Sequence, residues 1–190
     1  FSELPVSPVL DSENQWMNVQ VAFPGRIVSA RIWKATIGRI NLYLLDTDYE
    51  ANNPDDRAIT NNLYGGNEEH RLKQEMILGV GGIRMIVNLG IHPDIYHCNE
   101  GHAAFIGLER IRRLMEVKHF KFDESLEVVR GSTLFTTHTP VPAGHDAFHE
   151  DLIRTYMGHY PALLNITWQE CTDLGRIHAG NSGEKFSMSY

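Results

Sequence analysis

The pattern of apolar and polar positions separates a strand-rich first part of the chain from a later part that mixes helices and strands. Residues 1–18 contain prolines and serines without periodicity, and we expect them to be irregular. Three strand-like runs with short links then follow, at residues 19–23, 26–35 and 40–46. Short links between strands favour antiparallel pairing, so we predict a β meander over residues 19–48. Its third strand is so apolar that we expect its centre to be buried on both faces.

A long amphipathic helix is predicted from about residue 67 to residue 89. Its apolar stripe has spacings of four, four, three and four residues, and consists of Leu72, Met76, Val80, Ile83 and Val87. Glycines at positions 79, 81 and 82 interrupt this helix. Each glycine costs about 1 kcal/mol relative to alanine, so we expect another element to approach closely there.

From residue 67 onward the predicted elements follow the order helix, strand, helix, helix, strand, helix. The two strands lie at about residues 94–97 and 132–137. Strands that alternate with helices in this way form parallel sheets with helical crossovers. We therefore predict an α/β arrangement over residues 67–176, followed by an irregular tail at residues 177–190.

The composition narrows the classes of function. A hydrophobic content of 42% supports a core, while a net charge of -7 argues against a general nucleic-acid or membrane-surface binder. No run is long and apolar enough to span a membrane. The two cysteines, Cys98 and Cys171, form no disulfide framework, which fits a reducing, cytoplasmic setting. The chain opens without an initiator methionine and closes on no periodic element, so we expect a piece of a longer protein.

Polar residues follow both predicted strands of the later part. Asn99, Glu100 and His102 come after the first strand, and His138 comes after the second. Gly101 is expected to supply the turn conformation between strand and helix. If the strands are parallel neighbours, these residues meet at the sheet edge where open α/β folds bind ligands. Their side chains then either hydrogen-bond a substrate such as a sugar or only cap a helix and fix a loop, and the spacing leaves both open.

Other chemistries are disfavoured. Two histidine-containing clusters fail to match a metal motif on one helix face, so we expect no metal site: His97, Glu100 and His102, and His138, His145 and His149. Cys98 lacks the basic setting of a nucleophilic cysteine. The glycine run at residues 79–82 lies in a helical pattern without a following Lys-Ser or Lys-Thr, so it is no phosphate loop.

Two segments, residues 97–105 (HCNEGHAAF) and 135–146 (FTTHTPVPAGHD), resemble the α-glucan phosphorylases that act on glycogen, starch and maltodextrin. The resemblance is closest to the bacterial and archaeal branch. Residues 42–48, 63–66 and 71–75 follow the same family in the same order. The resemblance covers most of residues 19–176. Because several motifs occur in the family's order, it is more specific than a match to any single motif would be.

The resemblance implies a fold and an activity. The chain would be part of an N-terminal glycosyltransferase-B domain with a Rossmann-like parallel sheet. Such enzymes use inorganic phosphate to release glucose 1-phosphate from the ends of α-1,4-glucans. They carry pyridoxal phosphate on a lysine of the C-terminal domain, which is absent here, and its phosphate acts in proton transfer. The parent enzyme would be a homo-oligomer, and this chain alone would be inactive.

The resemblance also assigns roles to individual residues. His138 resembles the histidine of the catalytic pocket that contacts the terminal glucose, partly through its backbone carbonyl, whose dipole could favour positive charge on the sugar. Glu100 and His102 resemble an acidic residue and a histidine that line the glucan path. Tyr64 and Arg71 resemble residues that flank the same path, with Tyr64 able to stack on a sugar face.

The chain departs from the family pattern in several places. Many relatives have aspartate where this chain has Glu100, and the loop between Tyr64 and Arg71 is shorter than in the animal enzymes. Asn67 is the candidate for their gating asparagine. An acidic residue that many relatives carry near Ala143 is missing.

Two other classes of function stay open. A nucleotide-sugar glucosyltransferase of the glycogen-synthase type shares the architecture and also places a histidine after a core strand. A non-catalytic glucan-binding module would bind glucan without a catalytic partner domain. Assays of the parent protein with phosphate and with ADP-glucose distinguish the first alternative from a phosphorylase. The C-terminal sequence of the parent protein distinguishes the second.

Overall fold

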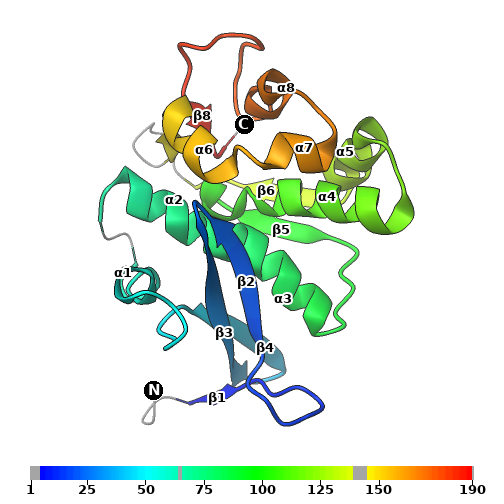
Figure 1. Ribbon diagram of the computed structural model, residues 1–190. Coiled ribbons are helices and arrows are strands. Elements are labelled where there is room, and N and C mark those ends of the chain that lie inside the picture. Colours follow the sequence, from blue (N-terminus) through cyan, green and yellow to red (C-terminus); the bar gives the residue numbers. More distant parts are fainter. Residues whose placement is uncertain (1–4, 64–65, 139–144, 190) are drawn as a thin grey trace.

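The computed structural model describes residues 5–63, 66–138 and 145–189, and it mixes helices with sheets (Figure 1). The predicted α/β class is therefore confirmed. An antiparallel sheet forms the first part of the chain, from β1 (Val6–Pro8), β2 (Asn18–Phe23), β3 (Arg26–Ile37) and β4 (Ile40–Asp46). The central strand is β3, which pairs antiparallel with the other three strands.

The antiparallel sheet differs from the expectation at two points. Residues 1–18 are not irregular throughout, because β1 pairs with β3 through Val6 and Ala35. The centre of β4 is not buried on both faces, because Leu42 and Leu44 are 44% and 37% exposed. An apolar run therefore marks a strand here without marking burial of both its faces.

The predicted long helix is present as three consecutive segments: α2 (Glu68–Met76), a π-helical turn η1 (Ile77–Gly81) and α3 (Gly82–Asn88). Asn67 begins it as the N-cap, since its side chain accepts a hydrogen bond from the His70 N–H at 3.0 Å. Four residues of the predicted stripe are buried: Leu72, Met76, Val80 and Ile83. The glycines coincide with η1 and with its junction to α3.

Gly79 is the position at which another element approaches the helix most closely. A Cβ added there would lie 2.7 Å from the Phe105 Cβ, whereas a Cβ added at Gly82 meets nothing within 4 Å. The expectation of close approach thus holds for Gly79 and fails for Gly82.

Gly79→Ala is expected to lower the free energy of unfolding by about 1–3 kcal/mol, because the new methyl group overpacks a core contact. The matched control, Gly82→Ala, should raise it by up to about 1 kcal/mol through helix propensity alone. Urea unfolding of both variants measures the difference. Equal effects at the two positions would contradict the packing argument.

The second part of the chain contains a parallel strand pair. Strands β5 (Tyr96–Asn99) and β6 (Thr133–Thr136) pair from Tyr96↔Thr133 to Asn99↔Thr136. The 3-10 turn η2 (Gly101–Ala103) and helices α4 (Ile106–Lys118) and α5 (Phe122–Gly131) connect them. The predicted parallel pairing is confirmed, so the polar residues after the two strands share one sheet edge.

The last elements form a helical cap with a short strand pair. They are β7 (Ala147–Phe148), α6 (Glu150–Met157), α7 (Tyr160–Leu164), α8 (Trp168–Asp173) and β8 (Phe186–Ser187). The tail after residue 176, expected to be irregular, contains β8, which pairs antiparallel with β7. None of the helices in the described part of the chain is long and apolar enough to cross a membrane.

The helix formed by α2, η1 and α3 lies between the antiparallel sheet and the parallel pair (Figure 1). Its buried face packs in one core with the antiparallel sheet and α4. A fully buried carboxylate ties this core to the helical cap: Glu109 of α4 accepts from Arg84 Nε and Arg112 Nη2, both at 2.9 Å, and from Tyr160 OH at 3.1 Å. Burial alone would raise the pKa of Glu109, but Arg112 and Arg84 lower it on balance.

Candidate functional site

The ends of β5 and β6 are joined by a carboxylate. Glu100, directly after β5, accepts a hydrogen bond from the backbone N–H of His138 at 2.6 Å. Its second oxygen accepts from Thr137 Oγ1 at 3.2 Å. The hydrogen bond from the His138 N–H has the largest effect on the pKa of Glu100. Together with the bond from Thr137, it holds this pKa below its usual value. The structure thus brings two predicted site residues, Glu100 and His138, into direct contact.

The backbone of Glu100 is strained. Its φ of 63° and ψ of -177° fall in a region that essentially only glycine adopts, at a cost of about 1–3 kcal/mol. The turn conformation expected of Gly101 therefore belongs to Glu100. Gly101 is required for another reason, because a Cβ there would lie 2.9 Å from Met188. Strain of this kind is typical of functional sites and persists only where the surroundings enforce it.

The side chain of His138 is exposed and its ring is oriented by β5. The Nε2 atom lies 2.7 Å from Asn99 Oδ1. Both the backbone and the ring of His138 are therefore positioned from the neighbouring strand. The residues that follow, 139–144, lie outside the described part of the chain.

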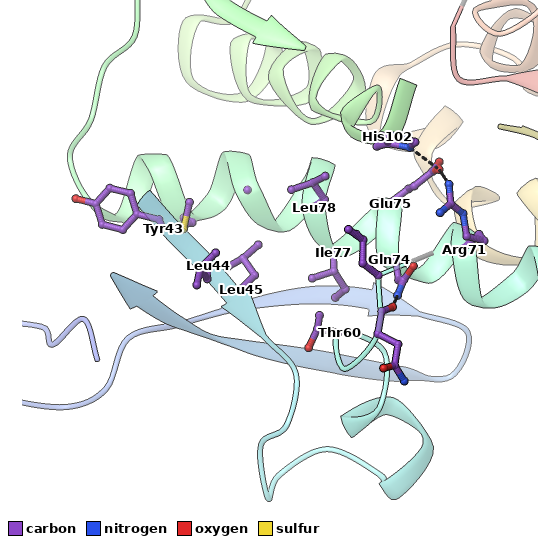
Figure 2. A pocket seen from close by; sticks show the side chains of 14 residues that line it. Tyr43, Leu44, Leu45, Thr60, Arg71, Gln74, Glu75, Ile77, Leu78 and His102 are labelled. Carbon is purple, nitrogen blue, oxygen red and sulfur yellow. Dashed lines mark hydrogen bonds and ion pairs between the residues drawn. The ribbon is translucent and has the colours of Figure 1, made fainter. Parts of the chain in front are cut away.

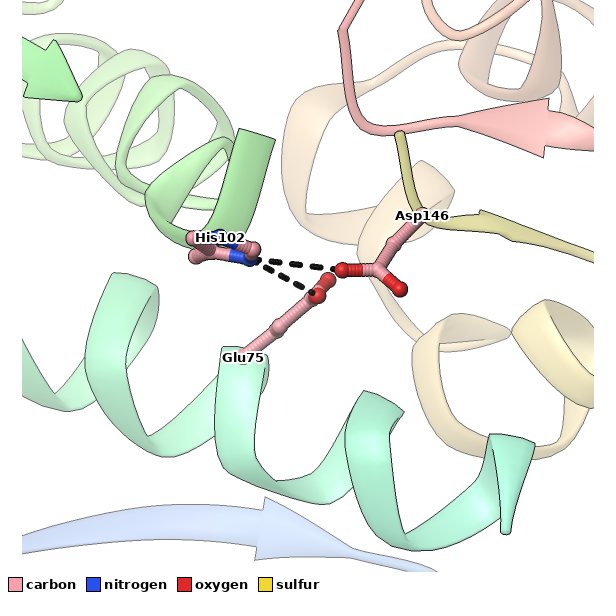
Figure 3. A group of neighbouring side chains, drawn as sticks. All are labelled: Glu75, His102 and Asp146. Atoms are coloured by element: carbon pink, nitrogen blue, oxygen red, sulfur yellow. Dashed lines mark ion pairs between the residues drawn. The ribbon is translucent and has the colours of Figure 1, made fainter. Parts of the chain in front are cut away.

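A second group of ionisable side chains lies between α2, η2 and the segment before β7 (Figure 3). Arg71 Nη2 forms a close ion pair with Asp146 Oδ2. His102 Nδ1 lies 3.3 Å from the same oxygen. Asp146 thus joins Arg71 and His102, two predicted site residues from distant parts of the sequence.

Glu75 and Asp146 belong to this group, and the sequence analysis missed both. The polar run at residues 71–75 is typical of a solvent-exposed helix face, yet Glu75 is only 3% exposed. Its position three residues after Leu72, on the apolar stripe, was the available signal. Asp146 belongs to the family-like segment 135–146, but nothing in its spacing shows that it meets α2.

A cavity of about 340 Å³ opens beside this group of ionisable side chains (Figure 2). Its walls come from β4, the loop after α1 (Pro54–Arg57), the long helix and η2. Apolar side chains dominate, including Leu44, Leu45 and Leu78, while Arg71, Glu75 and His102 line its polar end. An apolar wall with a few convergent polar groups is typical of a ligand pocket.

Two residues predicted from the sequence, Tyr64 and Asn67, remain. Tyr64 lies outside the described residues. Asn67 caps α2, and a gating role for it stays a prediction.

The group Glu75, His102 and Asp146 is compact enough to suggest a cation, since one ligand atom of each lies within 4.8 Å of the others. Arg71, however, already pairs with Asp146 Oδ2. A bound cation would have to displace this guanidinium from the carboxylate.

A pyridoxal phosphate site does not fit the residues described around these contacts. The cofactor needs a lysine amine, and none of the residues assembled here is a lysine. Lys73, the lysine on α2, points to Glu69 instead, with its Nζ 3.1 Å from the Glu69 carboxylate.

Comparison with curated proteins finds several relatives that are named as phosphorylases. The chain is 42% identical over 98% of its length to "Maltodextrin phosphorylase" of Thermococcus litoralis. It is 46% identical over 81% of its length to "Glycogen phosphorylase" of Mycobacterium tuberculosis, and 38% identical over 90% to that of Aquifex aeolicus. It spans only 22%, 18% and 25% of these relatives. No protein-family model matches the chain.

Proposed function

This chain is a homologue of part of the maltodextrin and glycogen phosphorylases, and from that premise we propose that it acts as part of an α-1,4-glucan phosphorylase. The parent enzyme would transfer the terminal glucose of a glucan to inorganic phosphate and release glucose 1-phosphate. The observation that carries the proposal is the hydrogen bond that the His138 backbone N–H donates to Glu100, which fixes His138 beside the end of β5.

The residues of the site have separate roles in this proposal. Glu100 holds the His138 segment, so that the His138 carbonyl dipole can face the sugar ring as positive charge develops. Arg71 and His102, joined by Asp146, line the path of the glucan. Tyr64 would stack on a sugar face from the loop before α2.

The remaining parts of the enzyme are proposed to lie elsewhere in the parent protein. The parallel pair β5–β6 would belong to the Rossmann-like sheet of an N-terminal glycosyltransferase-B domain that contains residues 1–190. A C-terminal domain would supply the lysine for pyridoxal phosphate, whose phosphate serves in proton transfer when bound. We further propose a homo-oligomeric, cytoplasmic enzyme.

The test uses the full-length protein with maltoheptaose and either phosphate or ADP-glucose. We expect glucose 1-phosphate with phosphate and no chain extension from ADP-glucose. Extension from ADP-glucose would instead support the glycogen-synthase type, and glucan binding without either reaction would support a non-catalytic module.

The isolated 190-residue chain is expected to release no glucose 1-phosphate, because its described site offers no lysine for the cofactor. Its phosphorolysis of maltoheptaose, measured under the conditions used for the full-length protein, is the relevant assay. Measurable product from the isolated chain would contradict this part of the proposal.

A further inference from the structure

Glu75 is a buried carboxyl group of the site that has no hydrogen-bond donor beside it among the described residues. It is 3% exposed, and neither carboxylate oxygen receives a hydrogen bond. Arg71 Nη2 and His102 Nδ1 each lie 3.8 Å from Oε1, too far for a hydrogen bond. The carboxylate of Asp146 lies next to it (Figure 3).

Two neighbouring carboxylates in a buried site cannot both be ionised without a large penalty. Asp146 has the better partners, since Arg71 pairs with it directly and His102 lies 3.3 Å away. Glu75 has no donor, and an unpaired buried charge is strongly unfavourable. The charge therefore belongs on Asp146, and the proton belongs on Glu75.

From this geometry we propose that Glu75 is a positioning residue of the glucan path. As a neutral acid it donates a hydrogen bond from its carboxyl group to Asp146, and Asp146 in turn holds Arg71 and His102. The inference rests on the proposed function for the identity of the ligand, but the hydrogen bond itself does not depend on it.

The pKa shifts of the two carboxyl groups agree in direction with this assignment. Burial, followed by the bond to Asp146, raises the pKa of Glu75 to about 9. The pKa of Asp146, which burial alone would raise, is lowered by the Glu75 hydrogen bond and by Arg71. Arg71 from α2, His102 from η2 and Asp146 from the segment before β7 are the charged or titratable groups placed around Glu75 by its ion-pair and carboxyl contacts.

Loss of the proton has a specific consequence. An ionised Glu75 repels Asp146 and competes with it for Arg71 and His102, so both side chains move from the positions in which they face the glucan. We therefore expect glucan affinity to fall as the pH rises through about 9.

The first test follows phosphorolysis of maltoheptaose by the full-length protein from pH 6 to pH 10. The KM of the wild type should rise at alkaline pH. Glu75→Gln keeps the size of the side chain and a hydrogen-bond donor, so its KM should remain within about threefold of wild type at pH 7. Because the amide does not ionise, this variant should lack the alkaline rise in KM. Glu75→Leu removes the donor and should raise KM at least about tenfold at every pH, with kcat less affected. An alkaline rise shared by wild type and Glu75→Gln, or a Glu75→Gln variant as impaired as Glu75→Leu, would overturn the proposal.

A second readout does not depend on activity. Infrared difference spectra between wild type and Glu75→Gln should contain the C=O stretch of a buried protonated carboxyl group at pH 7. Absence of this band, or stoichiometric binding of added Zn²⁺ that Glu75→Gln abolishes, would overturn the assignment. A protonated Glu75 in a protein without phosphorolysis would contradict the proposed function and support the Glu75–Asp146 hydrogen bond.

Discussion

Glu100→Ala is expected to lower kcat/KM for phosphorolysis of maltoheptaose at least about 100-fold in the full-length protein. The substitution removes both hydrogen bonds that hold the segment after β6, from the His138 N–H and the Thr137 hydroxyl. A displacement of about 1 Å in such a segment can cost about 100-fold in rate. Steady-state release of glucose 1-phosphate measures the loss.

Two controls sharpen this prediction. Glu100→Asp keeps an acceptor and should retain activity within about tenfold of wild type, because a carboxylate can still reach the loop. Glu127→Ala removes an exposed carboxylate of α5 and should leave kcat/KM unchanged. A Glu100→Ala variant within threefold of wild type would show that the contact does not position the reacting groups.

Glu109→Ala is expected to lower the free energy of unfolding by about 3 kcal/mol. The carboxylate is fully buried between α3, α4 and α7, and its loss leaves two guanidinium groups and the Tyr160 hydroxyl without their shared acceptor. Removing one partner of a buried ion pair typically destabilises by about 3–5 kcal/mol. The partial exposure of Arg84 and Arg112 places the expected loss at the lower end. Urea unfolding gives the value.

Glu116→Ala is the matched control for this effect. Glu116 lies on the same helix and pairs with the same Arg112, but its side chain is 62% exposed. Surface pairs contribute at most about 1 kcal/mol, so the control should unfold close to wild type. If Glu109→Ala were no more destabilising than Glu116→Ala, the claim that the buried carboxylate stabilises the fold through its three partners would be wrong.

The sequence predicted the elements that have strong local signals. The stripe from Leu72 to Ile83 repeats at helical spacing and is buried as predicted. The alternation of helices and strands correctly predicted that β5 and β6 are parallel, and so that Glu100 and His138 share one edge. These inferences succeed because period and connection length are local properties of the chain.

The features that the sequence did not reveal depend on distant contacts. Strands β1 and β8 are only 3 and 2 residues long, too short for a period to be seen, and their partners lie far along the chain. Asp146 meets Arg71 across 75 residues. The strain at Glu100, next to a glycine better suited to it, is set by the bonds to the neighbouring strand and by Met188 packing on Gly101.

The central claim is that glucan binds against the ends of β5 and β6. Amide hydrogen exchange of the full-length protein, with and without maltoheptaose, tests it most directly. We predict slower exchange with the sugar in residues 96–103 and 133–138, and unchanged exchange in α5 at residues 122–131. Protection that spares both strand ends while the sugar is bound would contradict the account.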